Sequence, residues 1–143
     1  NEIDRCYWPF TLHNCRSVEI AGNRVQLSGI GGLATLEDAG EIRITDNRFR
    51  LTRGPIVINN ACSGIVIDQN VYEDPFGRFL QVAGGTKDLE IASNDWGVCP
   101  EKKDFVGVEY PSALNPVLFK GQKYVMKDDD RNGKEDNRCE PAD

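Results

Sequence analysis

The stretch Ile42-Arg43-Ile44-Thr45-Asp46-Asn47-Arg48-Phe49 decides the fold, because its pattern recurs along the chain. The pattern is apolar-x-apolar-x-x-Asn-x-apolar, and it is carried by residues 18–25, 42–49, 65–72 and 89–96. The asparagines of the four segments are Asn23, Asn47, Asn70 and Asn94, so successive repeats are separated by 24, 23 and 24 residues. Apolar side chains recur at every second position within a segment, which is the periodicity of a β-strand.

Each repeat contains two further short strands. One precedes the asparagine-bearing strand, and we expect it at 10–13, 34–37, 56–59 and 80–83. Another follows the asparagine, as at 25–27 and 49–51. Three short strands per repeat, with no helical segment between them, cannot form separate small sheets with useful cores. They predict coils that stack, so that each strand pairs with its equivalent one turn further on.

This pattern resembles the right-handed parallel β-helix of the pectate-lyase type. The resemblance covers residues 9 to 96 and extends to about 125. We therefore predict an all-β fold of about 4–5 coils, each of 23–24 residues, over residues 1–126, with an irregular last coil from about 97 that includes 105–110 and 116–119. Residues 127–143 form a separate acidic tail or linker.

The asparagine column has a structural explanation. Asparagine tolerates left-handed backbone angles, and its side chain bonds to nearby backbone groups. Asparagines stacked in successive coils would also bond to one another in a ladder. The apolar residues two positions later should form an inward stack, with a sugar-binding aromatic platform as the functional alternative: Val25, Phe49, Tyr72 and Trp96.

Composition excludes several classes of partner. The 143 residues carry 17 basic and 23 acidic side chains, a net charge of −6 that argues against nucleic-acid binding. No apolar stretch approaches the ~20 residues of a membrane span, and no signal sequence is visible. Because the first methionine is Met126 and no cap precedes Phe10, we expect a C-terminal fragment with further β-helix coils upstream in the parent chain.

The repeat also bears on the five cysteines. Cys15 and Cys62 occupy equivalent places two coils apart, with Ala39 in the coil between. Two strand spacings put them about 10 Å apart, whereas a disulfide needs Cα atoms within about 7 Å. We predict that they are unpaired, buried thiols. Pairing among Cys6, Cys99 and Cys139 stays open.

The tail carries a candidate calcium loop. Oxygen-bearing side chains alternate around Gly133, a spacing that suits a hard cation, and the predicted metal ligands are Asp128, Asp130, Asn132 and Asp136. The segment resembles the aspartate repeats of thrombospondin type 3 and EF-hand-like loops. It departs from them at position 12, where Cys139 replaces a bidentate glutamate, and it has one copy only. A solvated tail without calcium is the alternative.

The resemblance to pectate-lyase-like β-helices implies a polysaccharide or glycan partner and a secreted or cell-surface location. It places a cleft along the outer face of the strands that precede the asparagine-bearing ones. The predicted catalytic residues there are His13, Glu37 and Asp38, because histidine suits proton transfer and paired carboxylates suit glycoside hydrolysis. The predicted substrate-binding residues are Asn14, Asn59, Asn60 and Gln81.

The resulting hypothesis is a glycoside hydrolase. A non-catalytic glycan-binding or adhesion scaffold is the alternative, because exposed polar side chains are the default on a sheet face. A polysaccharide lyase ranks third, since the outward positions of these strands carry no lysine or arginine that could act as a base. Arg43 lies on the next strand, where we expect a cross-strand ion pair with Glu19.

Overall fold

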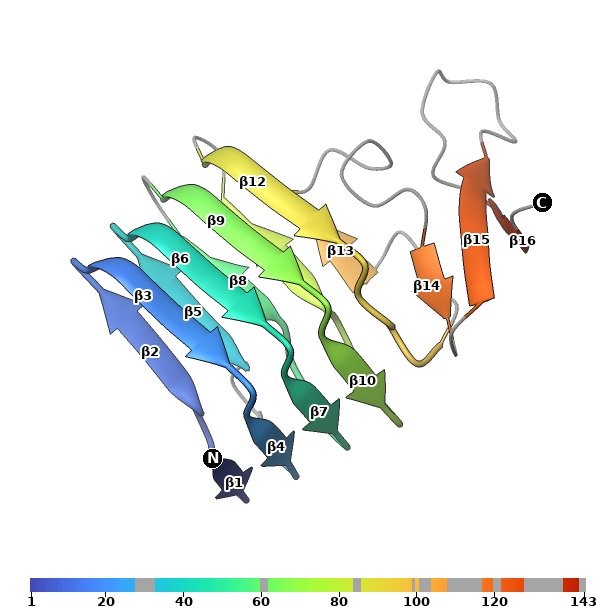
Figure 1. Ribbon diagram of the computed structural model, residues 1–143, viewed down its shortest axis with the longest axis horizontal. Helices are drawn as coiled ribbons and strands as arrows, with labels where there is room; N and C mark the ends of the chain where they lie inside the picture. Colours follow the sequence, from blue (N-terminus) through green and yellow to red (C-terminus); the bar gives the residue numbers. More distant parts are fainter. Residues whose placement is uncertain are drawn as a thin grey trace.

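Figure 1 shows a computed structural model of the chain in which short parallel strands wind into a β-solenoid of about four turns. The structure describes residues 1–27, 33–59, 62–83, 86–98, 100 and 104–107, and the backbone of 117–119, 122–127 and 138–141. The described residues form strands and turns with almost no helix, which confirms the predicted all-β parallel β-helix.

Three parallel sheets run the length of the solenoid. Sheet A consists of β1 (Glu2–Asp4), β4 (Arg24–Gln26), β7 (Arg48–Arg50) and β10 (Val71–Glu73). Sheet B consists of β2 (Phe10–His13), β5 (Ala34–Glu37), β8 (Ile56–Ile58), β11 (Leu80–Val82) and β13 (Phe105–Val106). Sheet C consists of β3 (Arg16–Ala21), β6 (Gly40–Thr45), β9 (Ser63–Asp68) and β12 (Lys87–Ala92).

The register between coils follows the sequence repeat. Ile20 pairs with Ile44, Ile44 with Ile67, and Ile67 in turn with Ile91, so equivalent positions of successive repeats lie side by side. These side chains point inward and are buried. Because a slip of one residue would turn every one of them to solvent, burial of this column holds the coils in register.

The asparagine ladder lies at the turn between sheets C and A. Nδ2 of Asn47 donates to Oδ1 of Asn70 at 3.0 Å, and Nδ2 of Asn70 donates to Oδ1 of Asn94 at 2.9 Å. Nδ2 of Asn47 also lies 2.7 Å from the carbonyl oxygen of Ile20 in the preceding coil. The four asparagines are buried, which confirms their structural role.

The left-handed backbone angle belongs to the residue before each asparagine, contrary to our expectation. The residues with positive φ are Gly22, Asp46, Gln69 and Ser93. This placement turns the chain from sheet C toward sheet A while the following asparagine side chain points inward. The asparagine is therefore required for its amide, which reaches the next coil, and the turn conformation falls on its neighbour.

The interior beside sheet A is filled by the predicted inward stack. Val25, Phe49, Tyr72 and Trp96 are each at most 2% exposed. The ring centroids of Phe49 and Tyr72 lie 5.0 Å apart, and those of Tyr72 and Trp96 lie 5.1 Å apart in a stacked arrangement. Because these rings are buried, they cannot form the sugar-binding platform that was the alternative.

The cysteines confirm the coil alignment. The carbonyl groups of Cys15, Ala39 and Cys62 accept equivalent hydrogen bonds from the following sheet C strands. Cys15 and Cys62 are free thiols, as predicted, although only Cys62 is fully buried and Cys15 is half-buried. Cys6 is also free, whereas Cys99 and the side chain of Cys139 lie outside the described residues.

A separate antiparallel sheet follows the solenoid. It consists of β14 (Val117–Phe119), β15 (Gln122–Lys127) and β16 (Arg138–Pro141). The fifth coil continues in sheet B as β13, which pairs in parallel with β11. We expected β14 in that coil, but it pairs antiparallel with β15 instead. β16 lies within the stretch expected to be a tail, and the division between a β-helix and a tail stays a prediction.

Candidate functional site

His13 and Glu37 meet on the outer face of sheet B. They are in direct register on the neighbouring strands β2 and β5, because their positions in successive repeats are equivalent. Nδ1 of His13 lies 3.4 Å from Oε2 of Glu37. The side chains are 56% and 42% exposed, so a ligand in solution can reach both. This contact places an imidazole beside a carboxylate, a pairing that suits proton transfer.

Asn14 and Asp38 occupy the turns that follow these two strands. Both have positive φ, 51° and 47°, a conformation that asparagine and aspartate tolerate better than most residues. The N–H of Asn14 donates to the carbonyl oxygen of Glu37 at 3.1 Å, which keeps the two turns aligned. Both side chains are exposed. Asp38 therefore follows the His13–Glu37 pair at the same edge of sheet B.

The remaining predicted binding residues are more scattered. The N–H of Asn59 donates to the carbonyl oxygen of Leu36 at 2.8 Å, so Asn59 continues the row of His13 and Glu37 in the third coil. Gln81 pairs with Val57 in a different row of sheet B, in the fourth coil. Gln81 is thus not adjacent to the His13–Glu37 pair. Asn60 lies outside the described residues.

The predicted calcium ligands cannot be placed. Asp128, Asp130, Asn132 and Asp136 lie outside the described residues, so the calcium loop stays a prediction. Within the described part of the chain, no group of three or more His, Cys, Asp or Glu side chains is arranged to hold a metal ion. The same part of the chain contains no helix with the length and apolar character needed to cross a membrane.

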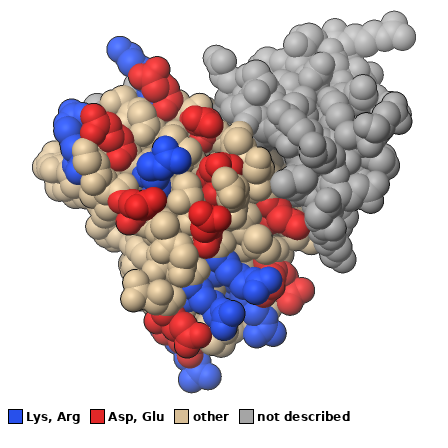
Figure 2. All heavy atoms as spheres, viewed as in Figure 1, with Lys and Arg blue, Asp and Glu red and all other residues tan. Residues whose placement is uncertain are grey.

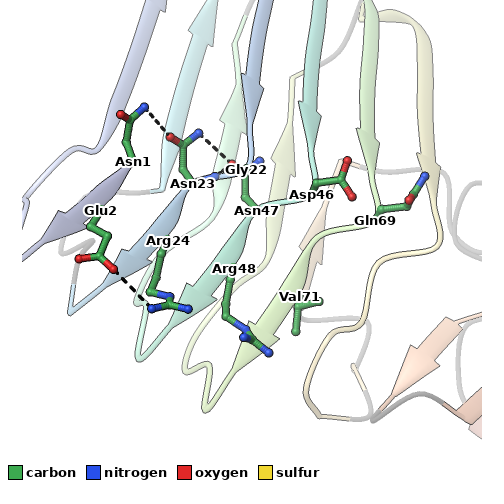
Figure 3. A pocket seen from close by; sticks show the side chains of 10 residues that line it. All are labelled: Asn1, Glu2, Gly22, Asn23, Arg24, Asp46, Asn47, Arg48, Gln69 and Val71. Carbon is green, nitrogen blue, oxygen red and sulfur yellow. Dashed lines mark hydrogen bonds and ion pairs between the residues drawn. The ribbon is translucent and has the colours of Figure 1, made fainter.

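A groove that sequence reasoning missed runs along the turn between sheets C and A. It has a volume of about 560 Å³ and crosses several coils (Figure 3). The turn residues Gly22, Asp46 and Gln69 lie along it. Asn1 and the ladder asparagines Asn23 and Asn47 also line it. The outward residues of sheet A that line it are Glu2, Arg24, Arg48 and Val71.

Two arginines and two acidic residues carry the charge of this groove: Arg24 and Arg48, with Glu2 and Asp46. Arg24 and Arg48 are in direct register on β4 and β7, and Figure 3 shows both side chains projecting from sheet A. NH1 of Arg24 lies 3.4 Å from Oε1 of Glu2, and Nε of Arg48 lies 3.0 Å from Oε1 of Glu73. Figure 2 shows basic side chains at the lower edge of the molecule, with acidic side chains on either side of them, where Figure 1 places sheet A.

The groove had a signal in the sequence. The triplets Asn23-Arg24-Val25 and Asn47-Arg48-Phe49 repeat an arginine directly after a ladder asparagine. Since the asparagine and the apolar residue point inward, the arginine between them must point outward, in the same row in both coils. The turn that hollows the surface beside this row is a tertiary feature, and the sequence pattern does not indicate its depth.

Two other surface features bear on function. Tyr7 and Trp8 are 55% and 44% exposed, and their ring centroids lie 6.0 Å apart. Arg43 is in register with Glu19 on the neighbouring strand, as expected. The two described side chains do not form the predicted ion pair, and Arg43 is exposed to solvent. Within the described part of the chain, Arg43 is therefore a surface cation on sheet C without an ion-pair partner.

Comparison of the chain with protein-family models, with curated proteins and with solved structures finds no match.

Proposed function

We propose that this chain belongs to a secreted or cell-surface glycoside hydrolase that acts on a polysaccharide or glycan along the outer face of sheet B. The observation that supports the proposal is the 3.4 Å contact between Nδ1 of His13 and Oε2 of Glu37, both accessible on adjacent strands. Glu37 and Asp38 supply the two carboxyl groups that glycoside hydrolysis uses, one as acid and one as base or nucleophile. His13 orients Glu37 and exchanges a proton with it.

The test is product analysis by mass spectrometry. The chain is incubated with plant, algal and host glycans, alongside Glu37→Gln and Asp38→Asn, which keep the shape of each side chain and remove its charge. Both variants should lose turnover at least about a hundredfold. Glu19→Gln, an exposed change on β3 in sheet C, is the control and should retain activity.

The products also discriminate between reaction classes. Saturated oligosaccharides indicate hydrolysis, and products with an unsaturated end would indicate a lyase instead. Turnover that survives both Glu37→Gln and Asp38→Asn would contradict the proposed site. The lyase alternative lacks a cationic base at this face, because the described outward positions of sheet B carry no lysine or arginine.

A non-catalytic glycan-binding or adhesion module is the second candidate. It is favoured by the exposed Tyr7–Trp8 pair, since aromatic faces offer large contact area to an amphipathic ligand. Under this hypothesis Trp8→Ala should reduce glycan retention on an array, whereas Phe76→Ala, an exposed aromatic elsewhere on the solenoid, should leave it unchanged. Equal losses in both variants, or none, would count against the module.

A further inference from the structure

We propose that the groove beside sheet A binds an acidic polysaccharide, with carboxylate or sulfate groups seated between Arg24 and Arg48. This site lies at the turn between sheets C and A, whereas the proposed hydrolytic residues lie on sheet B. The inference therefore goes beyond the proposed function and does not depend on it.

The two arginines face each other across neighbouring strands, and each is paired with a carboxylate on its far side. Arg24 and Arg48 are directly opposite each other on parallel strands, which are about 4.8 Å apart. Like charges placed directly opposite each other on a sheet destabilise it. Their carboxylate partners belong to β1 and β10, on the outer sides of the pair, so neither carboxylate lies between the two arginines. An anion in the gap would contact both guanidinium groups and remove this repulsion.

Each arginine has N–H groups that its ion pair does not use. A guanidinium carries five N–H groups, and each arginine uses one nitrogen in its carboxylate contact: NH1 in Arg24 and Nε in Arg48. The side chains are 57% and 51% exposed, so the remaining N–H groups are open to a ligand. Planar guanidinium groups match the oxygen geometry of carboxylate and sulfate, which favours these anions over neutral ligands.

The rest of the groove favours a hydroxylated ligand. The Asp46 carboxylate lies on the wall and makes no ion pair with any described residue, so it can accept hydrogen bonds from hydroxyl groups. The Gln69 amide both donates and accepts. A chain that carries both hydroxyl groups and anions satisfies the two kinds of side chain, and an acidic polysaccharide is such a chain. A polyphosphate chain carries no hydroxyl groups and would leave the Asp46 carboxylate and the Gln69 amide without partners.

The groove runs along the solenoid axis, a direction that suits an extended ligand. It follows the solenoid axis past Asn1, Asn23 and Asn47, which belong to three successive coils. A polymer lying along this axis meets Arg24 and Arg48 in two adjacent coils, and the groove offers further polar side chains at Glu2, Asp46 and Gln69. A small anion would contact only the arginine pair, and the polymer gains from the neighbouring coils as well.

The test measures binding of polygalacturonate, which carries carboxylates, and of dextran sulfate, which carries sulfates, with unmodified dextran as the neutral control. Titration calorimetry at about 50 mM salt should detect binding to at least one polyanion and none to dextran. Affinity should fall at least about tenfold at about 200 mM salt because the contacts are ionic. Binding to one polyanion only assigns the anion class that the groove recognises.

Variants locate the site. The double variant Arg24→Gln with Arg48→Gln should weaken binding at least about tenfold, and Arg48→Lys, which keeps the charge and loses the planar fork, should weaken it several-fold. Arg43→Gln removes a surface cation on sheet C and should leave the affinity unchanged. Thermal melts check that each variant is folded.

Three outcomes would overturn the proposal: no binding to either polyanion, equal binding to dextran, or equal losses in the double variant and in Arg43→Gln. Glu37→Gln should bind the polyanions like the parent chain. A chain that binds without turnover would refute the proposed hydrolysis alone, and a chain that turns over glycans without binding here would refute only this groove.

Discussion

The side chain of Asn1 donates a hydrogen bond from Nδ2 to Oδ1 of Asn23 at 3.1 Å. The carbonyl oxygen of Asn1 accepts the N–H of Arg24 at 2.8 Å, just as that of Asn23 accepts the N–H of Arg48 at 2.8 Å. Asn1 is therefore a further rung of the ladder, one coil before the first asparagine that the repeat identified. The triplet Asn1-Glu2-Ile3 matches the end of the pattern, and β1 pairs with β4 in consequence.

The first prediction concerns the middle of the ladder. Asn47→Ala should lower the free energy of unfolding by about 1–3 kcal/mol. Oδ1 of Asn47 accepts hydrogen bonds from both the backbone N–H and Nδ2 of Asn23 at 3.0 Å. Alanine leaves the buried N–H without a partner and leaves Nδ2 with only the carbonyl oxygen of Ala21. Denaturant unfolding measures the change. Asn59→Ala, at an asparagine outside the ladder that is not among the positive-φ residues, is the control and should cost far less. Equal effects would contradict the ladder's energetic role.

The second prediction compares two glycines that share a left-handed conformation. Gly22 and Gly97 have φ of 63° and 72°. A Cβ at Gly97 would collide with the backbone carbonyl of Tyr72, whereas a Cβ at Gly22 would have no atom within 4 Å. Gly97→Ala should therefore destabilise the fold by about 2–4 kcal/mol and Gly22→Ala by about 1 kcal/mol, the cost of the backbone conformation alone. Thermal melts of the two variants measure the two losses of stability. A larger loss in Gly22→Ala than in Gly97→Ala would contradict the packing at Tyr72.

The third prediction concerns the buried hydroxyl of Tyr72. This group has no hydrogen-bond partner among the described residues, although the side chain is 2% exposed. A buried, unpaired polar group opposes folding, so Tyr72→Phe should leave stability at pH 7 unchanged or raise it by up to about 1 kcal/mol. A loss above that size in denaturant unfolding would indicate that the hydroxyl has a partner.

The fourth prediction follows from the ionisation of the same group. Burial raises the pKa of Tyr72 above its ordinary value of about 10. The unfolded chain then releases this proton first as pH rises, so the ionisation of Tyr72 costs no stability below pH 10 and lowers the free energy of unfolding progressively above it. Unfolding measured between about pH 10 and about pH 11.5 should show a steeper loss in the parent chain than in Tyr72→Phe. Parallel losses in the two proteins would contradict this assignment.

The fifth prediction concerns thiol accessibility. Cys62 is 1% exposed and its Sγ donates to the carbonyl oxygen of Asn59 at 3.0 Å. With reductant present, iodoacetamide should label Cys62 at least about tenfold more slowly than Cys6 and Cys15, because labelling requires local opening. Peptide mass spectrometry gives the rates, and labelling in denaturant should remove the difference. Recovery of a Cys15–Cys62 cross-linked peptide without reductant would contradict the coil alignment.

The sequence predicted that His13 and Glu37 lie on neighbouring strands, but it did not predict the contact between their side chains. His13 and Glu37 occupy the same place in successive repeats, so the repeat alone brings them to neighbouring strands. Whether the imidazole turns toward the carboxylate depends on side-chain rotamers and on the left-handed turns at Asn14 and Asp38. Gln81 was grouped with them because it shares sheet B, but its row and its coil keep it apart from the pair.

The sequence by itself determined the architecture. Its period of about 24 residues, the alternation within each strand and the asparagine column are local and repetitive, and they specify which residues of one coil meet which residues of the next. Only the tertiary structure decided the groove beside sheet A and the departure of β14 into an antiparallel sheet. The groove is lined by turn residues and by outward side chains of sheet A from successive coils, so it exists only once the coils are stacked, and residue spacing does not encode its shape.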